Sequence, residues 1–493
     1  SSPSEPLSRI PPCSWDPSLS RGAYSLALSR LKNYLFAGDT YQINYTFRLS
    51  TSLPGSPRTL FENLVEAQGA HYSAFVDTGS FALCSASPEL FFSLDGERLE
   101  SRPMKGTAKR GLTSGEDRRQ ARALRESAKN RAENVMIVDM IRNDMGRVAI
   151  PGTVEAGPLF DVERYPTVWQ MVSTVTARTR SSVTDILTAL FPCASITGAP
   201  KPRTMAIIAA EETTPRRIYT GSIGYLAPGR QAQFNVAIRT VLVDRETLRA
   251  DYGVGGGIVW DSETENEYDE CWLKARILTD RQPAFELLET IRWTPEAGYF
   301  LLERHLQRAL DSADYFDIPL SRREALSALH QHEATLVSGG AHRIRLLVAR
   351  DGTIRIESVP LAPADTATPV RVRLASKPVD PANRFLYHKT THRAVYEEAK
   401  SGLTDCDDVL LWNPAGELTE STIANIVVER EGERITPPVG SGLLQGVYRA
   451  ELLEQGKIRE AIIRTEDLFR CGKIYLISSV REWREATLLT ASR

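Results

Sequence analysis

The sequence has few of the features that mark disulfide-rich, membrane-spanning or nucleic-acid-binding proteins. Its six cysteines lie far apart and form no CxxC pair, which argues against a thiolate metal site and a disulfide framework. No run of apolar residues is long enough to cross a bilayer. The formal net charge of -2 gives no electrostatic reason to expect a nucleic acid or an anionic membrane as partner. These absences favour a soluble cytoplasmic protein.

Histidine is scarce in the first half of the chain. Of the seven histidines, only His71 precedes residue 300. A histidine general base or a polyhistidine metal site is therefore not expected in this half. Carboxylates and lysines are the remaining candidates for its chemistry.

The 493 residues are too many for a single hydrophobic core, and the pattern of elements begins anew near residue 283. We expect a mixed α/β (α+β) fold in two domains, over residues 21–280 and 283–493, after a flexible lead-in over residues 1–20 that is rich in serine and proline. Apolar spacing predicts a helix at 21–37 and one long charged helix at 114–143. A strand is predicted over 233–244.

A group of carboxylates stands near the end of the first half. Spacings of three and four place Glu267, Glu270 and Lys274 on one helix face, a pattern that is also typical of a solvated salt-bridge ladder. The preceding glycines, 255–257, favour a functional site over a solvated ladder, because glycines weaken a strand and are expected where another group approaches its backbone closely. Glu133 lies in a second predicted helix, at the point where its sequence changes from charged to apolar residues. Oxygen ligands without histidine or cysteine suit Mg²⁺.

Two further features indicate anion binding. The loop that contains Thr197 and Gly198 leads through Lys201 into a predicted helix, and backbone N–H groups at a helix start can bind a carboxylate. Arg239 lies in the apolar run at 233–244, so it is either buried against a carboxylate or on a sheet edge. The first alternative fits a bidentate anion clamp.

Together these motifs resemble the chorismate-binding family, which includes anthranilate, aminodeoxychorismate, isochorismate and salicylate synthases. The matching stretches follow the family order from residue 38 to residue 275. They are GDTYQINYT (38–46), SPELFF (87–92), RPMKGTAKRG (102–111), KNRAENVMIVDMIRNDMGRV (129–148), FPCASITGAPKPRTM (191–205), YTGSIGY (219–225), FNVAIRT (234–240) and GGGIVWDSETENEYDECWLKA (255–275).

The resemblance implies a β-sandwich with surrounding helices and an active site between its layers. It implies that Glu133 and Glu270, with Glu267 close by, hold Mg²⁺ for the ring carboxylate of chorismate, and that Lys274 lies beside the metal. Other positions would contact the substrate. The resemblance implies this role for Thr197, Gly198, Tyr219, Arg239 and Gly255.

Two positions favour the aminodeoxychorismate branch of this family. Lys105 stands where that branch carries a lysine that is thought to attack the ring, and covalent capture divides a difficult displacement into two easier steps. Gln170 stands where anthranilate synthases usually carry a histidine linked to pyruvate elimination. The amination half should therefore stop at 4-amino-4-deoxychorismate. Because no cysteine lies in a Gly-x-Cys-x-Gly elbow, ammonia is expected from solution or from a separate glutamine amidotransferase subunit.

The second half contains a lysine, a glutamate and a glycine-rich turn that could bind a cofactor. Lys389 follows a strand-like run and precedes a predicted helix, where a surface lysine is an equally good interpretation. Glu420 could pair with a pyridinium nitrogen. The N–H groups around Gly446 and Val447, at a helix start, could bind a phosphate.

This half resembles the fold-type IV pyridoxal-phosphate enzymes. The matching stretches are HLQRALDSADYF (305–316), HKTTHRAVY (388–396), GELTESTIANIVV (416–428) and LLQGVYRAELLE (443–454). The resemblance implies that Lys389 is the Schiff-base lysine, that Glu420 holds the pyridine nitrogen, and that Arg308, Val447 and Ser479 bind the phosphate. It also implies a homodimer formed through this domain.

The combined interpretation is a bifunctional enzyme of folate biosynthesis that forms 4-aminobenzoate from chorismate by amination and pyruvate elimination. The choice of a lyase over an aminotransferase rests mainly on the fusion. One alternative is an isochorismate, salicylate or anthranilate synthase fused to a D-amino-acid or branched-chain aminotransferase-like domain. Another is a chorismate-binding scaffold with a decayed first site that docks an amidotransferase.

Overall fold

The computed structural model describes residues 10–279, 283–336, 340–363 and 368–489. Residues 1–9 of the expected lead-in, and 280–282 at the expected domain boundary, lie outside the described residues. In the described ranges, no helix has the length and apolarity needed to span a membrane.

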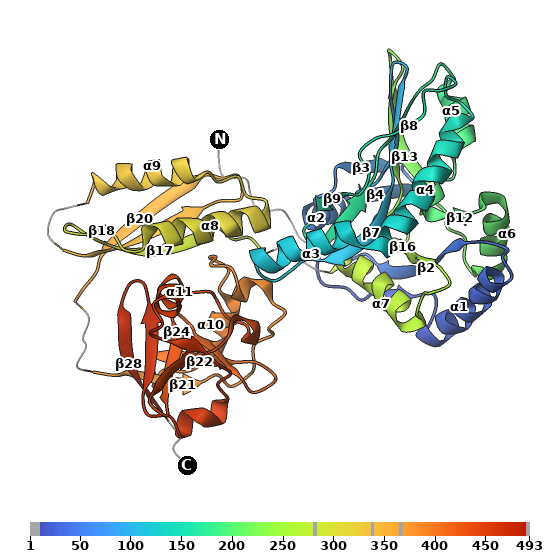
Figure 1. Cartoon of the computed structure of the whole chain (residues 1–493). Coiled ribbons are helices and arrows are strands. Elements are labelled where there is room, and N and C mark those ends of the chain that lie inside the picture. The colour runs from blue at the N-terminus through green and yellow to red at the C-terminus, as the bar shows by residue number, and fades with distance from the viewer. Residues whose placement is uncertain (1–9, 280–282, 337–339, 364–367, 490–493) are drawn as a thin grey trace. The chain divides into compact units, whose positions relative to one another are not determined.

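The chain forms two units, each of which combines helices and sheets (Figure 1). The amino unit consists of Ser1–Arg110 and Arg119–Gln282, and the carboxyl unit consists of Gly111–Arg118 and Pro283–Arg493. The mixed α/β class is therefore confirmed. The sequence patterns did not indicate that residues 111–118 group with the carboxyl unit.

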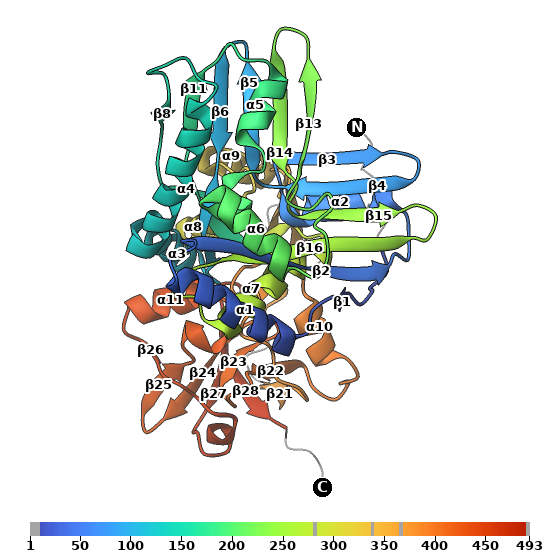
Figure 2. The ribbon, with the colours of Figure 1, turned by 90° about the vertical axis from the view of Figure 1, so that its right-hand side faces the viewer.

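Two large sheets and one small sheet form the framework of the amino unit. The seven-stranded sheet has the order β1 (Asp16–Pro17), β2 (Gln42–Ser52), β16 (Arg249–Ile258), β15 (Thr240–Asp244), β4 (Phe81–Ser87) and β3 (Tyr72–Asp77), with β12 (Gly198–Ala199) also on β2. The six-stranded sheet has the order β13 (Ser222–Ala227), β14 (Gln231–Val236), β5 (Leu90–Asp95), β6 (Arg98–Arg102), β11 (Val175–Arg178) and β8 (Glu155–Ala156). The small sheet consists of β7 (Met104–Lys109), β10 (Val168–Val172) and β9 (Asp161–Arg164). Figure 2 shows β5, β6, β13 and β14 upright, whereas β2, β3, β4, β15 and β16 run across the view.

Aromatic packing holds two helices, α1 (Arg21–Phe36) and α7 (Thr264–Ala275), on the seven-stranded sheet. Tyr24 of α1 contacts Tyr45 and Phe47 of β2 and Tyr268 of α7, with ring centroids 5.3–5.9 Å apart. All four rings are buried. Burial of each ring stabilises the fold by roughly 1.5–3 kcal/mol. This packing fixes the position of α7, which carries three of the predicted site residues.

The six-stranded sheet has a core of its own, formed with α4 (Ala128–Gly146) and α5 (Val183–Leu190). Ile137 and Ile141 of α4 and Ile186 of α5 are buried in this core with Phe92 of β5. Other described helices are α2 (Pro57–Gln68), α6 (Lys201–Glu211) and the short 3-10 turns η1 (Ala194–Ile196) and η2 (Arg276–Leu278), and α3 (Ser114–Glu126) begins in the segment that groups with the carboxyl unit.

Two predicted elements of the amino unit differ from the structure. The helix expected over 114–143 is divided into α3 and α4, because Ser127 adopts extended backbone and its hydroxyl accepts a hydrogen bond from Asn130 N–H at 3.3 Å. The strand expected over 233–244 is also divided, since β14 and β15 belong to different sheets. Arg239 lies between them with φ 51°.

The carboxyl unit contains a four-stranded sheet with the order β18 (Gly298–Tyr299), β17 (Leu287–Thr294), β19 (His342–Val348) and β20 (Ile354–Pro360). Helices α8 (Leu302–Phe316) and α9 (Arg322–Glu333) pack on this sheet (Figure 1), and Ile291, Leu306, Leu329 and Ile344 are fully buried between them. The strong amphipathic pattern of residues 302–316 thus follows from the burial of one helix face.

An eight-stranded sheet forms the rest of the carboxyl unit. Its order is β23 (Leu418–Ser421), β22 (Asp408–Trp412), β21 (Val370–Leu374), β28 (Glu482–Leu488), β27 (Ile474–Ser478), β24 (Asn425–Arg430), β25 (Glu433–Thr436) and β26 (Arg459–Glu460). Because β23 also pairs with β24, six of these strands close into a barrel. The unit also contains two short α-helices, α10 (Ala394–Lys400) and α11 (Val447–Glu454).

The sequence-based placement of Lys389 was wrong in its local structure. Lys389 lies in the irregular segment between the 3-10 turn η3 (Arg384–Leu386) and α10, and its carbonyl accepts a hydrogen bond from Leu288 N–H at 3.0 Å. The lysine is therefore held by β17 rather than by a strand or a helix of its own segment.

Ser127→Ala should lower the free energy of unfolding of the amino unit by about 1 kcal/mol, because it removes the amino-terminal cap of α4. Urea unfolding measures this loss. Ser29→Ala is the matched control, since the Ser29 hydroxyl donates only to the Ser25 carbonyl within α1, and it should change stability by less than about 0.5 kcal/mol. Equal losses in the two variants would contradict the assigned cap.

Candidate active sites

A cavity of about 280 Å³ lies inside the amino unit. Its lining comes from β2, β7, β10 and β16 and from helices α4 and α7, so that strands from two sheets and two helices meet there. Most of the predicted site residues of this half line it. They are Lys105, Glu133, Gln170, Tyr219, Arg239, Gly255, Glu267, Glu270 and Lys274.

The glycines of β16 make room for the lysines of this cavity. A Cβ at Gly257 would lie 2.7 Å from Lys105 Nζ, and one at Gly256 would lie 3.1 Å from the carboxylate of Glu267. Lys274 Nζ donates to the Gly255 carbonyl at 2.9 Å. Side chains at Gly256 and Gly257 would therefore displace charged groups, whereas a Cβ at Gly255 would lie 2.3 Å from the Tyr45 carbonyl of β2.

Each of two carboxylates in the cavity is paired with a lysine. Lys105 Nζ lies 3.3 Å from Glu133 Oε2, and Lys274 Nζ lies 2.7 Å from Glu270 Oε1. Lys274 holds the pKa of the Glu270 carboxyl below its ordinary value, so this group is a carboxylate at neutral pH. Burial raises the pKa of the Glu267 carboxyl, which accepts a hydrogen bond from the Ser262 hydroxyl at 2.6 Å.

The carboxylate oxygens of this cavity fit a Mg²⁺ ion that is bound by the protein and by a ligand together. No cluster of three or more His, Cys, Asp and Glu side chains that could hold a metal ion occurs within the described ranges. Mg²⁺ commonly takes one or two carboxylates and completes its shell with water and ligand oxygens. Glu133 and Glu270, on two different helices of one cavity, provide such a pair.

Lys105 and Gln170 lie on neighbouring strands. Strands β7 and β10 are antiparallel with Thr107 opposite Gln170, and the Thr107 hydroxyl donates to the Gln170 side-chain oxygen at 3.0 Å. Lys105 is two residues from Thr107 along β7, and both Lys105 and Gln170 line the cavity. The two residues that the sequence singled out therefore share one site.

Tyr219 and Arg239 form another part of the wall. The Tyr219 ring lies against Gly253, where a Cβ would be 2.0 Å from the ring. Burial raises the pKa of the Tyr219 phenol, so the hydroxyl remains neutral and can donate a hydrogen bond. Arg239 donates to the backbone carbonyl of Lys274. The two side chains present donors to one cavity, as an anion site requires.

Thr197 and Gly198, which were expected to contact the substrate, do not line the cavity. Gly198 pairs with Ile43 of β2, and the Thr197 hydroxyl donates to the Cys193 carbonyl at 3.1 Å. Lys201 Nζ is paired with Asp144 at 2.7 Å. Thr197, Gly198 and Lys201 are absent from the cavity lining, which the same loop supplies through Ser195 and Ile196.

Glu89 is a cavity residue to which the sequence patterns assigned no role. Its side chain is 3% exposed, and its Oε1 accepts a hydrogen bond from the Ser195 hydroxyl at 2.7 Å. Burial raises the pKa of this carboxyl to about 7. The sequence signal that could have identified Glu89 is its position directly before the apolar strand β5, within SPELFF.

In the carboxyl unit, Lys389 lies beside a buried charge cluster. Glu289 of β17 accepts from Arg308 Nε at 2.8 Å and Nη2 at 2.6 Å, and its Oε2 lies 2.7 Å from His305 Nδ1. Although burial opposes ionisation, Arg308 brings the pKa of Glu289 down to about 2. Burial, together with the positive charge of Arg308, lowers the pKa of Lys389 to about 8. A sizeable fraction of the Lys389 amine is therefore neutral near physiological pH.

The other predicted cofactor residues lie on neighbouring elements. Glu420 of β23 accepts a hydrogen bond from the Tyr396 hydroxyl at 2.8 Å, and burial raises the pKa of its carboxyl to about 7. Val447 is the first residue of α11, and Arg308 Nη1 donates to the Gln445 carbonyl just before that helix at 3.1 Å. The Ser479 hydroxyl donates to the Thr290 carbonyl at 3.4 Å.

This donor set fits pyridoxal phosphate. Lys389 is an amine of lowered pKa, Glu420 is a buried carboxyl that can pair with a pyridine nitrogen, and a helix start lies beside the Arg308 guanidinium. A Cβ at Gly446 would lie 1.9 Å from Asn425 Oδ1, so only glycine keeps the turn before Val447 in place.

Residues 1–280 match the model of the chorismate binding enzymes, and residues 286–489 match that of the class IV amino-transferases. Aminodeoxychorismate synthase component 1 of Salmonella typhimurium is 43% identical over 267 residues, which is 54% of this chain and 58% of the relative. Anthranilate synthase component 1 1 of Haloarcula marismortui is 40% identical over 262 residues, or 53% of each chain. Anthranilate synthase component I of Streptococcus pneumoniae has a similar structure, with a TM-score of 0.50 and 30% identity over 56% of this chain and 60% of that one.

Both resemblances inferred from the motifs are thus confirmed at the level of families. The chain spans little more than half the length of these curated relatives. Identities of 43% and 40% are too close to separate amination at C4 from anthranilate formation. The choice between the two therefore depends on the residues in the cavity.

Glu89→Gln should stabilise the amino unit at about pH 8 and leave it unchanged at about pH 4. As the pH rises from about 4.5 to 7, the unfolded carboxyl ionises while the buried one keeps its proton, so ionisation increasingly favours the unfolded state. Removal of this carboxyl should raise the free energy of unfolding by up to about 3 kcal/mol at the higher pH. Urea unfolding at both pH values measures the gain. Glu246→Gln, at an exposed position, is the control, and a pH-independent effect of Glu89→Gln would contradict the buried acid.

Proposed function

The chain belongs to the family of chorismate-binding enzymes, and we propose that it converts chorismate into 4-aminobenzoate in two steps. The amino unit aminates C4 of chorismate, and the carboxyl unit eliminates pyruvate from the product. The observation that carries the proposal is the joint presence of Lys105, Gln170, Glu133 and Glu270 in one cavity.

In the first step, Lys105 is the nucleophile and Glu89 the acid. The neutral Lys105 amine bonds to C2 of the ring, both ring double bonds shift, and the C4 hydroxyl departs as water with a proton from Glu89. Ammonia then bonds to C4, the double bonds return, and Lys105 leaves as a neutral amine. The proton lost by the new C4 ammonium returns Glu89 to its acid form. A buried carboxyl whose pKa is raised to about 7 still carries a donatable proton near neutral pH, which supports this role for Glu89.

The other cavity residues orient the substrate. Arg239 and Tyr219 would hold the enolpyruvyl carboxylate, with Gly255 as wall. Glu133 and Glu270, with Glu267 close by, would hold Mg²⁺, which when bound supplies positive charge for the ring carboxylate. Lys274, which pairs with Glu270, keeps that carboxylate ionised.

Gln170 supports a reaction that stops after amination. A neutral amide can donate and accept hydrogen bonds but cannot take up a proton as a histidine would. Pyruvate elimination therefore falls to the carboxyl unit. Anthranilate synthase is the second candidate function, because a relative with that name is 40% identical.

In the second step, the residues of the carboxyl unit would hold pyridoxal phosphate through Lys389, Glu420, Arg308, Ser479 and the Val447 backbone. When bound, this cofactor would supply an electron sink for the negative charge that develops on the substrate carbon bearing the amino group. Lys389, with a pKa of about 8, takes the proton from the ring carbon that bears the amino group and returns a proton to the departing enolpyruvate. Loss of pyruvate leaves an aromatic ring.

Several further properties belong to this proposal. Ammonia would come from a separate glutamine amidotransferase subunit or from solution, and the reaction would serve folate synthesis in the cytoplasm. The carboxyl unit would carry the contact of a homodimer. The expected lyase, rather than aminotransferase, follows from the presence of an amination unit that makes its substrate.

Lys105→Ala should abolish amination of chorismate, with a loss of roughly 100-fold or more in kcat. The measurement is chromatography of the products formed by the whole chain from chorismate, Mg²⁺, ammonium and pyridoxal phosphate. Lys109→Ala is the matched control, because Lys109 is an exposed residue of the same strand outside the cavity lining. Formation of anthranilate, salicylate or isochorismate by the unaltered chain would contradict the proposed reaction.

Lys389→Ala should leave amination intact and stop the second step, so that 4-amino-4-deoxychorismate accumulates and no 4-aminobenzoate forms. The same assay, with pyruvate measured in parallel, gives the result. Lys377→Ala, with a side chain that is 80% exposed, serves as control. Continued release of pyruvate by the Lys389 variant would refute the assignment of elimination to the carboxyl unit.

A further inference from the structure

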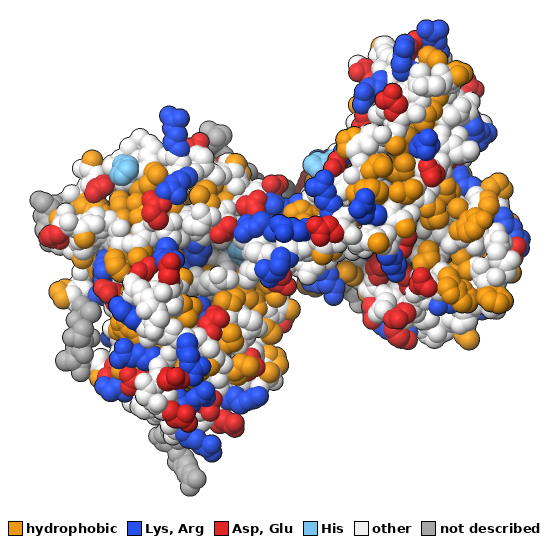
Figure 3. All heavy atoms as spheres, viewed as in Figure 1, with side chains coloured by type: hydrophobic (Ala, Val, Ile, Leu, Met, Phe, Trp, Pro, Cys, Tyr) orange, Lys and Arg blue, Asp and Glu red, His pale blue; other side chains and the backbone are white. Residues whose placement is uncertain are grey.

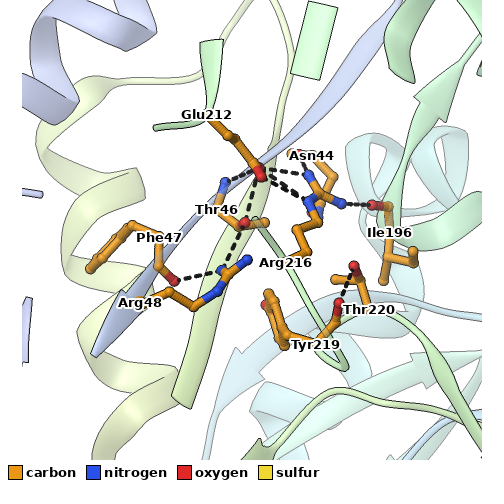
Figure 4. Close-up of polar contacts among 9 residues, drawn as sticks. All are labelled: Asn44, Thr46, Phe47, Arg48, Ile196, Glu212, Arg216, Tyr219 and Thr220. Atoms are coloured by element: carbon orange, nitrogen blue, oxygen red, sulfur yellow. Dashed lines mark hydrogen bonds and ion pairs between the residues drawn. The ribbon is translucent and has the colours of Figure 1, made fainter. Parts of the chain in front are cut away.

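A buried ion pair lies behind the wall of the amino-unit cavity (Figure 4). Arg216 donates to both carboxylate oxygens of Glu212, from Nε to Oε2 at 2.9 Å and from Nη2 to Oε1 at 2.7 Å. The side chains are 15% and 5% exposed. Thr46 of β2 adds two donors to Glu212 Oε1, its N–H and its hydroxyl, each at 2.9 Å. The pair is thus fixed to the strand that faces the glycines of β16.

Arg216 also reaches the cavity wall directly. Its Nη1 donates to the Ile196 carbonyl at 2.9 Å, and its Nη2 donates to the Asn44 carbonyl at 2.6 Å. Ile196 and Asn44 both line the cavity, whereas Arg216 and Glu212 do not. One guanidinium therefore joins the backbone of two wall segments that are about 150 residues apart in the sequence.

The turn that follows Arg216 carries Tyr219, a third wall residue. Arg217 and Thr220 have φ values of 51° and 63°. For residues with a side chain, this left-handed region costs roughly 1 kcal/mol or more each, so surrounding contacts must impose the turn. Arg216 anchors its start, and the Thr220 hydroxyl donates to the Tyr219 carbonyl at 2.6 Å at its end.

The Tyr219 ring packs against one cross-strand pair, Gly253 of β16 and Arg48 of β2. The Arg48 guanidinium lies 5.1 Å from the ring centroid, and its Nη1 donates to the Thr46 hydroxyl at 3.2 Å, the same hydroxyl that donates to Glu212. Figure 4 shows Arg48, Thr46, Glu212 and Arg216 as one chain of polar contacts beside this ring.

We propose that Arg216, held by Glu212, is a positioning residue for substrate binding in the amino unit. It sets the distance between Asn44, Ile196 and Tyr219 and thereby the geometry of the wall that would grip the carboxylate of chorismate. The inference rests on the proposed function for the identity of the substrate. Arginine suits this role because its planar fork serves the carboxylate and two carbonyls at once, whereas lysine keeps the charge but lacks that fork.

The test uses the whole chain with Arg216→Lys, Arg216→Ala and Glu212→Gln. Arg30→Ala is the matched control, because it removes the neighbouring ion pair with Glu211, which does not line the cavity. Four quantities are measured for each variant. These are kcat, KM for chorismate, KM for ammonium, and Kd for chorismate with Mg²⁺ in the absence of ammonium.

Arg216→Lys should raise both KM and Kd for chorismate about 10-fold and leave KM for ammonium unchanged, with a larger rise for Arg216→Ala. Glu212→Gln should have a smaller effect in the same direction, since the fork remains. The control should match the unaltered chain. If Arg216→Ala does not fold, the lysine and glutamine variants still decide the question.

A merely structural role would give another pattern. In that case Arg216→Lys would lower kcat in proportion to the folded fraction and leave both KM values and Kd unchanged, which would overturn the inference alone. If the unaltered chain neither binds chorismate nor forms an aminated product, the proposed function and this inference fail together. If it binds chorismate but Arg216→Lys binds equally well, only the inference fails.

Discussion

The amino unit depends on the pairing of the glycine-rich strand β16 with β2. Gly255, Gly256 and Gly257 lie opposite Thr46, Tyr45 and Asn44 in the ladder. One side of this pair is buried under the aromatic side chains of α1 and α7. Because the glycines carry no side chains, the amines of Lys105 and Lys274 can lie against the backbone with their carboxylate partners.

The same strand β2 connects the site with the ion pair behind it. Asn44 lines the cavity, Thr46 binds Glu212, and Arg48 lies against Tyr219. Buried charges of this kind are costly unless each is paired and hydrogen-bonded. The hydrogen bonds of this network fix the positions of the residues in the cavity wall more specifically than an apolar core would, although burial of the charges costs stability.

The carboxyl unit also buries charged groups, around Lys389 and Glu420. Glu289 and Arg308 form a buried ion pair, and burial, together with the nearby positive charge of Arg308, lowers the pKa of Lys389 to about 8. Glu420, in contrast, has no cationic partner at hydrogen-bond distance among the described side chains, and burial raises its pKa to about 7. On the faces visible in Figure 3, charged side chains of both signs are interspersed over each unit.

The sequence by itself determined the two families, the mixed α/β class, and a set of candidate residues in the first half, most of which line the cavity. Those residues were detectable because spacing along a helix, as for Glu267, Glu270 and Lys274, is a local property. Only the tertiary structure decided that Ser127 divides one predicted helix, that Arg239 lies between two sheets, and that Thr197 and Gly198 lie outside the cavity lining. The burial of Glu89 also came from the fold, because distant segments enclose this carboxyl and raise its pKa, and no local pattern encodes that burial.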